Sequence, residues 1–192
     1  MLDAIAQRPM QGANGIVGVG TRVRKPNGKT TTIKLLMNIL EPSRGSATIF
    51  GVDSRRLTSR ELSRIGYVSE NQELPQALRL GEYLSYLRPF YPKWDLCLER
   101  TIVKIFRLPL DRKISHFSHG MRMKTALTCA LCYHPELLIL DEPFNGLDPL
   151  IRDEFIEGLL HQAGQITVFM STHDLSDIES FATGITFMDS SG

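Results

Sequence analysis

The sequence contains no apolar run long enough to cross a membrane. Its strongly apolar stretches, such as Leu137 to Leu140, fall far short of the ~20 residues that a spanning helix needs. An excess of one charge is also missing, since 22 Lys and Arg residues stand against 21 Asp and Glu residues. Without a basic excess the chain lacks the electrostatic footprint of proteins that coat nucleic acid, so we expect no nucleic-acid partner. Any contact with a membrane is expected to go through a surface or a partner.

Cysteine is scarce, with Cys97, Cys129 and Cys132 as the three in the chain. An odd number of cysteines without a secretory signal pattern favours a reducing compartment over a disulfide framework. Cys129 and Cys132 form a C-x-x-C pair, but they lie in a segment of helical periodicity and have no second ligand pair. We therefore interpret the pair as core packing and not as a zinc site.

Segments with strand character alternate with segments of helical periodicity along the 192 residues, which we expect to form one α/β domain, 1–192. This alternation predicts a mainly parallel sheet flanked by helices, with ligands at the carboxyl ends of its strands. Residues 73–117 are predicted to be a helical insertion, in which the aromatic stretch RPFYPKWD packs against the insertion or a partner. We expect strands over 46–51, 65–69, 137–142, 166–172 and 184–189, and helices over 33–40, 118–134 and 174–181, with another from Asp148.

The stretch KPNGKTTTIKLL, residues 25–36, has the form of a phosphate-binding loop that runs into a helix. Gly28, Lys29 and Thr30 open this helix, where backbone N–H groups and the helix dipole favour an anion. Lys29 could reach terminal phosphates and the Thr30 hydroxyl could bind magnesium. The first glycine of the G-x-x-x-x-G-K-[ST] pattern is missing, because Val23 stands in its place. Alone, the tripeptide fits a structural helix start equally well.

A strand that ends in two adjacent carboxylates carries more information. LLILDEP, residues 137–143, places Asp141 and Glu142 at the carboxyl edge of the expected sheet. There Asp141 could hold magnesium, through water, and Glu142 could polarise an attacking water. The alternative is that both acids cap the next turn. The next strand ends in STHD, where His173 could contact a terminal phosphate. The alternative is an ordinary loop or core histidine.

The stretch HFSHGM, residues 116–121, predicts a second helix start that could bind an anion. Ser118 is a favourable N-cap and Gly120 allows a close approach. One nucleotide cannot easily occupy two helix ends in a single small domain, so an ordinary capped helix is the alternative.

Together, G-K-T, FSHGM, LLILDEP, NGLDP and STHD in this order resemble the nucleotide-binding subunit of ATP-binding cassette (ABC) transporters, from about Pro26 onward. FYPKWD and FSHGM are similar to bacterial subunits that pair with separate membrane proteins of the exporter type. The resemblance implies a P-loop NTPase-like fold, with a core of residues 1–72 and 118–192 and a helical subdomain of residues 73–117. The subdomain would lie between the Q-loop and the signature motif.

The resemblance also implies a role for each motif. Two cassettes meet head to tail in such proteins, and the signature of one closes on the ATP of the other, which would explain two anion sites. The Q-loop residue falls at Glu70 or at Gln72. The remaining implied positions are Asn27, Gly28, Lys29, Thr30 and Thr31 in Walker A, Asp141 and Glu142 in Walker B, Ser118 and Gly120 in the signature, Asp148 in the D-loop and His173 as the switch histidine.

Implied ligands and partners follow the family: ATP and Mg²⁺, a second copy of the cassette and a transmembrane permease, at the cytoplasmic face of the cell membrane. The chain departs from the family at His119, where glycine is commoner, and in a Walker A loop that is two residues short. Residues 1–28 also hold no aromatic side chain to stack on adenine. A hydrolysis-impaired sensor or scaffold cassette is therefore one alternative to an ATPase. A non-transport cassette is another, although no coiled-coil insertion or basic tract supports it.

Overall fold

Three parallel strands form the centre of the structure, a computed structural model that describes residues 28–160 and 166–174. They are β3 (Ile65–Ser69), β4 (Leu137–Asp141) and β5 (Thr167–Ser171), in the order β3-β4-β5. Their pairing sets Ser69, Asp141 and Ser171 side by side at the carboxyl end. The predicted parallel α/β sheet is confirmed.

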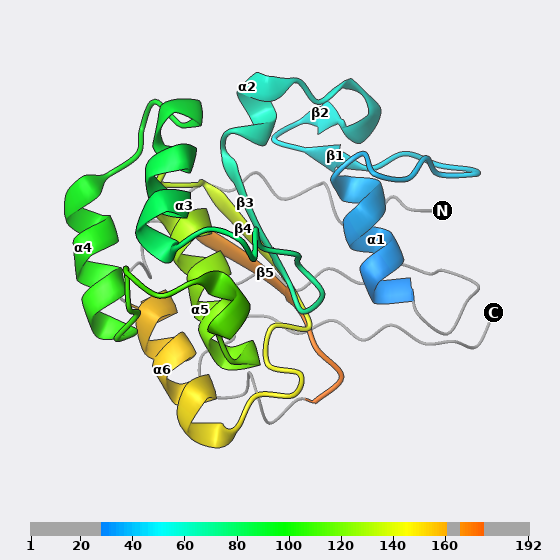
Figure 1. Ribbon diagram of the computed structural model, residues 1–192. Coiled ribbons are helices and arrows are strands. Elements are labelled where there is room, and N and C mark those ends of the chain that lie inside the picture. The colour runs from blue at the N-terminus through cyan, green and yellow to red at the C-terminus, as the bar shows by residue number, and fades with distance from the viewer. Residues whose placement is uncertain (1–27, 161–165, 175–192) are drawn as a thin grey trace.

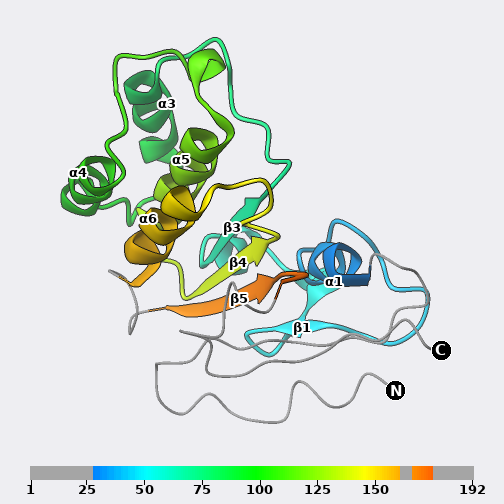
Figure 2. The same ribbon diagram turned by 90° about the horizontal axis from the view of Figure 1, so that it is seen from below.

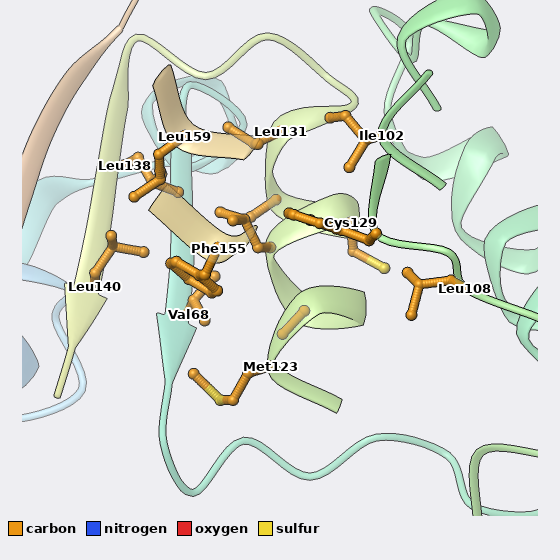
Figure 3. Packing of buried hydrophobic residues seen from close by; sticks show 14 of the residues in the cluster. Val68, Ile102, Leu108, Met123, Cys129, Leu131, Leu138, Leu140, Phe155 and Leu159 are labelled. Atoms are coloured by element: carbon orange, nitrogen blue, oxygen red, sulfur yellow. The ribbon is translucent and has the colours of Figure 1, made fainter. Parts of the chain in front are cut away.

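Helices cover both faces of this sheet. Helix α1 (Gly28–Leu36) lies on one face, whereas α5 (His119–Leu131) and α6 (Pro149–Leu160) lie on the other (Figures 1 and 2). The strand side chains alternate accordingly. Ile139 packs in a cluster with Ile33 of α1, while Leu138 and Leu140 pack in the larger cluster around Phe155 of α6 (Figure 3). An uninterrupted apolar strand is what burial on both faces requires, as predicted for β4.

The segment between β3 and α5 is mainly helical. It contains α3 (Leu80–Leu87), the 3₁₀ turn η2 (Arg88–Phe90), α4 (Leu96–Ile105) and the 3₁₀ turn η3 (Ile114–His116).

Glu99, only 5% exposed, anchors the aromatic stretch within this segment. Its carboxylate accepts hydrogen bonds from Arg88 Nη2 at 2.6 Å and Trp94 Nε1 at 2.7 Å. The Tyr91 ring stacks on Tyr133, with centroids 4.2 Å apart. The aromatic stretch therefore packs against the insertion and the end of α5, as one of the predicted alternatives.

Helix α1 is shorter at its end than the apolar periodicity predicted. The pattern runs to Leu40, but the helix stops at Leu36 because Asn38 takes a left-handed backbone conformation, φ +56°. The N–H of Ile39 donates to the carbonyl of Lys34 at 2.8 Å, and that of Asn38 donates to Leu35 at 3.3 Å. These bonds form a Schellman cap. Leu40, the last residue of the pattern, lies on the surface, where it is 43% exposed.

The strand predicted over residues 46–51 does not join the parallel sheet. It forms β1 (Thr48–Ile49), which pairs antiparallel with β2 (Val52–Asp53). Phe50 and Gly51, with φ of +53° and +77°, make the two-residue turn that such a hairpin requires. The 3₁₀ turn η1 (Ser54–Arg56) and helix α2 (Ser59–Leu62) then lead into β3.

Helix α5 also ends earlier than predicted, at Leu131 and not at His134. His134 has a left-handed backbone, φ +52°, and Pro135 cannot continue a helix. The helix predicted over 174–181 and the strand predicted over 184–189 fall almost entirely outside the described residues.

The three thiols differ in exposure, and we expect them to differ in reactivity. Cys97 is exposed, whereas Cys129 and Cys132 are buried, as predicted for core residues. Burial raises the pKa of Cys129 to about 12 and raises that of Cys132 as well, so neither forms thiolate at neutral pH. Ellman's reagent should titrate one thiol rapidly in the folded protein and three after unfolding. Rapid reaction of a folded Cys97→Ser variant would contradict this burial.

Candidate functional site

Two hydroxyl groups hold Asp141 at the carboxyl end of the central strand, β4. Ser171 Oγ donates to Asp141 Oδ1 at 2.7 Å, and Thr30 Oγ1 of α1 donates to the same oxygen at 3.2 Å. Asp141 is only 4% exposed. The structure therefore brings together the predicted metal residues Thr30 and Asp141, and it adds Ser171, which the sequence reasoning missed. The sequence feature that could have indicated Ser171 was its position in STHD, at the carboxyl end of a predicted strand, like Asp141.

Glu142 leaves the strand through an unusual backbone conformation. Its φ is +49°, a left-handed value that costs a non-glycine residue roughly 1–3 kcal/mol. Its N–H donates to both Ser171 O and Ser171 Oγ, each at 3.1 Å, which fixes the start of the turn. The side chain consequently extends toward α1 and the end of β5.

The Glu142 carboxylate joins the two other predicted catalytic or phosphate-contacting groups. Lys29 Nζ lies 2.6 Å from Glu142 Oε1, and His173 Nδ1 lies 2.8 Å from Glu142 Oε2. The backbone N–H of His173 also donates to Oε2, at 3.2 Å. Because an ionised carboxylate only accepts, His173 Nδ1 carries the proton in this contact.

The electrostatics keep Glu142 ionised. Burial alone would raise its pKa, but hydrogen bonds from Lys29 and His173 outweigh burial and hold the pKa of Glu142 below its usual value. At neutral pH the site therefore contains a carboxylate between a lysine and a histidine. A carboxylate in this setting can accept a proton from a nearby water.

The start of α1 offers an anion site next to these groups. The helix begins at Gly28, so the N–H groups of its first turn point out of this end, and Lys29 adds a positive charge in the same turn. Asn27, also predicted here, lies outside the described residues. The adjacent oxygens of Thr30 and Asp141 are the hard donors that Mg²⁺ prefers. Within residues 28–160 and 166–174 no cluster of three His, Cys, Asp or Glu residues could hold a metal, so magnesium here would depend on phosphate and water oxygens as well.

Glu70 and Gln72 follow β3 at the same edge. Glu70 N donates to Asp141 O at 3.1 Å, and Gln72 N donates to Ser69 O at 3.0 Å. With residues of α5, both line a cavity of about 330 Å³. These contacts do not show whether Glu70 or Gln72 is the Q-loop residue, so both stay candidates for that role.

Ser118, Gly120 and Asp148 form a separate group at the starts of α5 and α6. Ser118 Oγ accepts a hydrogen bond from Met121 N at 3.2 Å, the predicted N-cap, and Asp148 Oδ1 accepts one from Ile151 N at 3.1 Å. A Cβ on Gly120 would lie 2.7 Å from Ile151 Cγ2, so this close approach needs glycine. These helices cover the face of the sheet opposite α1 (Figure 2).

A parallel sheet with a lysine and a threonine at a helix start and two acids at a strand end defines a P-loop NTPase-like α/β fold. The ABC transporter family model matches residues 24–145 of the chain. A solved structure described as the ATP binding subunit of an ABC transporter is similar with a TM-score of 0.74 and 31% identity, covering 88% of this chain and 72% of that one. The chain therefore belongs to the ABC transporter family.

Two curated relatives are transport proteins of Bacillus. The chain is 35% identical over 161 residues to the bacitracin transport ATP-binding protein BcrA of Bacillus licheniformis, covering 81% of this chain and 52% of BcrA. It is 32% identical over 160 residues to the ABC-type transporter ATP-binding protein EcsA of Bacillus subtilis (strain 168), covering 80% of this chain and 65% of EcsA. The match thus spans about half to two thirds of these relatives.

The lowered pKa of Glu142 predicts a pH-dependent contribution to stability. Because the folded pKa lies below the unfolded value of 4.5, the stabilisation is present above that value and is lost as the pH falls through the folded pKa. Urea unfolding should therefore show wild type more stable than Glu142→Gln at neutral pH, with a difference that shrinks under acid conditions. Glu73→Gln, an exposed carboxamide control, should show no such trend. A difference that is constant with pH would contradict this coupling.

Proposed function

We propose that the chain is an ATP-hydrolysing subunit of an ABC transporter. The observation that carries this proposal is the group of Lys29, Glu142 and His173 at the end of the sheet, with 2.6 Å between Lys29 Nζ and Glu142 Oε1. The relatives' names, which describe ATP-binding transport proteins, support the same assignment.

Hydrolysis would use Glu142 as the base. In the structure Lys29 neutralises Glu142, and the phosphates of a nucleotide at the start of α1 would compete for the same ammonium. Once Lys29 binds phosphate, Glu142 is available to accept the proton of the attacking water, while His173 keeps the carboxylate oriented. Thr30 and Asp141 would hold Mg²⁺, which neutralises phosphate charge. Asn27, Gly28 and Thr31 would complete the phosphate site, with Glu70 or Gln72 beside it.

A second copy of the chain would supply the rest of the nucleotide site. The starts of α5 and α6, with Ser118, Gly120 and Asp148, lie on the face of the sheet opposite α1. This position supports contact with the nucleotide bound by the partner. We propose a head-to-tail homodimer in which residues 73–117 act as a helical subdomain of a single domain, 1–192.

The membrane component would be a separate permease. No helix in residues 28–160 is long and apolar enough to span a bilayer. A peripheral position on the cytoplasmic face of the membrane fits a subunit that drives such a permease.

Magnesium-dependent release of phosphate tests the enzyme. Replacing Glu142 by Gln keeps the shape of the side chain but removes the base, which should lower kcat by about 10²- to 10⁴-fold. The exposed Glu73→Gln variant should retain the wild-type rate. Equal, background-level release of phosphate by wild type and Glu142→Gln would contradict the proposal that the chain hydrolyses ATP.

The shorter Walker A loop favours a second candidate, a sensor or scaffold cassette that binds ATP weakly or not at all and acts through contacts. The stretch RKPNGKTTT is two residues shorter than the loop of typical family members. Calorimetric titration with millimolar ATP separates the two. A binding cassette should give saturable heat that Lys29→Ala abolishes, because the lysine is the cation of the proposed site. A scaffold that does not bind gives no saturable heat in either protein.

A further inference from the structure

His119 stands in the signature where the family commonly has glycine, and its side chain makes a contact that glycine cannot make. Its Nε2 lies 3.1 Å from the backbone carbonyl oxygen of Asn145, in the turn after β4. A carbonyl oxygen only accepts hydrogen bonds, so Nε2 carries the donated proton. The imidazole thus connects the first turn of α5 with the turn of residues 142–148.

The turn of residues 142–148 is shaped to receive this ring. Asn145 N donates to Glu142 O at 3.2 Å, and Leu147 N donates to Phe144 O at 3.1 Å. Gly146 follows with φ +68°, and a Cβ built on it would lie 3.8 Å from His119 Cδ2. The ring therefore lies close against the backbone of the turn. At the base of the turn, Phe144 is buried, with its ring edge-on to Phe155, 5.5 Å between centroids.

A second contact joins the same two regions. Gly120 approaches Ile151 of α6 so closely that a Cβ would lie 2.7 Å from Ile151 Cγ2. The amide of Ile151 in turn donates to Asp148 Oδ1 at 3.1 Å. The start of α5 is thus attached to both the middle of the turn and the start of α6.

We infer that His119 is a positioning residue that makes the signature and the turn of residues 142–148 move as one unit. Glu142 begins this turn and contacts Lys29 and His173, whereas Asp148 ends it and caps α6. The inference rests on the proposed function, in which Ser118 and Gly120 meet the partner's nucleotide. A movement of the signature would then reach Glu142 through the His119–Asn145 hydrogen bond.

Three substitutions isolate the hydrogen bond. Gln can place an N–H near the position of His Nε2, whereas Asn is too short and Ala has no donor. His116→Ala, which removes an exposed imidazole just upstream, is the matched control. His119 is itself exposed, so we expect all four variants to fold, which circular dichroism would verify.

Amide hydrogen exchange of the full chain, followed by NMR, reads the coupling directly. In His119→Ala and His119→Asn the amides of Asn145 and Leu147 should exchange about threefold to tenfold faster, the range expected for loss of one hydrogen bond. His119→Gln and His116→Ala should exchange like the wild type. Unchanged exchange in His119→Ala overturns the inference. So does equal acceleration in the Gln variant, because the ring's packing and not its donor would then hold the turn.

Steady-state hydrolysis adds the functional readout. We expect kcat to fall about threefold to tenfold in the Ala and Asn variants, with recovery in Gln and an unchanged KM for ATP, since Lys29 and Thr30 are untouched. A kcat that stays at the wild-type level despite faster exchange overturns the coupling to Glu142. If the wild type itself does not hydrolyse ATP, the proposed function fails, whereas the exchange experiment still decides whether His119 holds the turn.

Discussion

The in-register pairing of β3, β4 and β5 is the constraint on which the candidate site depends. Because the three strands are parallel and end together, Ser69, Asp141 and Ser171 are neighbours at one edge. The residues that follow them, Glu70, Glu142 and the loop to His173, must therefore emerge at the same edge. A shift of β4 by one residue would turn Asp141 to the other face of the sheet and remove it from Thr30 and Ser171.

Glu142 balances two opposing effects at this edge. Burial disfavours its charge, and the lysine and histidine beside it restore the charged form. The left-handed backbone at Glu142 is what lets two adjacent acids contact different partners: Asp141 contacts hydroxyl groups, and Glu142 contacts the Lys29 ammonium and the His173 imidazole. Backbone strain at one residue thus separates the side chain proposed to hold magnesium from the side chain proposed to accept the proton of water.

The sequence was sufficient to predict the features that depend on a pattern within one helix or strand. The parallel sheet, the buried cysteines and the N-caps at Ser118 and Asp148 follow from local periodicity and residue chemistry, and the structure confirms them. The end of α1 could not be predicted from apolar spacing, since Leu40 keeps the spacing after the Asn38 cap has stopped the helix. The cap residue was the better signal, because Asn tolerates the left-handed backbone.

Contacts between distant segments could not be predicted from the sequence. Ser171 contacts Asp141 because β5 ends level with β4. STHD places Ser171 at a predicted strand end, but its alignment with Asp141 follows only from the strand pairing. The His119–Asn145 contact spans 26 residues and depends on a turn whose shape is set by Glu142 and Gly146. The sequence predicted a functional role for both segments, but it could not show that one segment contacts the other.

The helical insertion packs against α5 and α6, the helices that begin next to Ser118 and Asp148. Tyr91 stacks on Tyr133 just beyond α5, and Phe106, just after α4, contacts Gly158 of α6 so closely that a Cβ there would lie 2.3 Å from the ring. Lys124 of α5 pairs with Glu154 of α6, which fastens the two supporting helices to each other. Because these contacts reach α5 and α6, a displacement of the insertion would act first on the helices that carry Ser118 and Asp148. The loop after β3, with Glu70 and Gln72, is then the direct connection from the insertion to the carboxyl end of the sheet, where Asp141 and Glu142 lie.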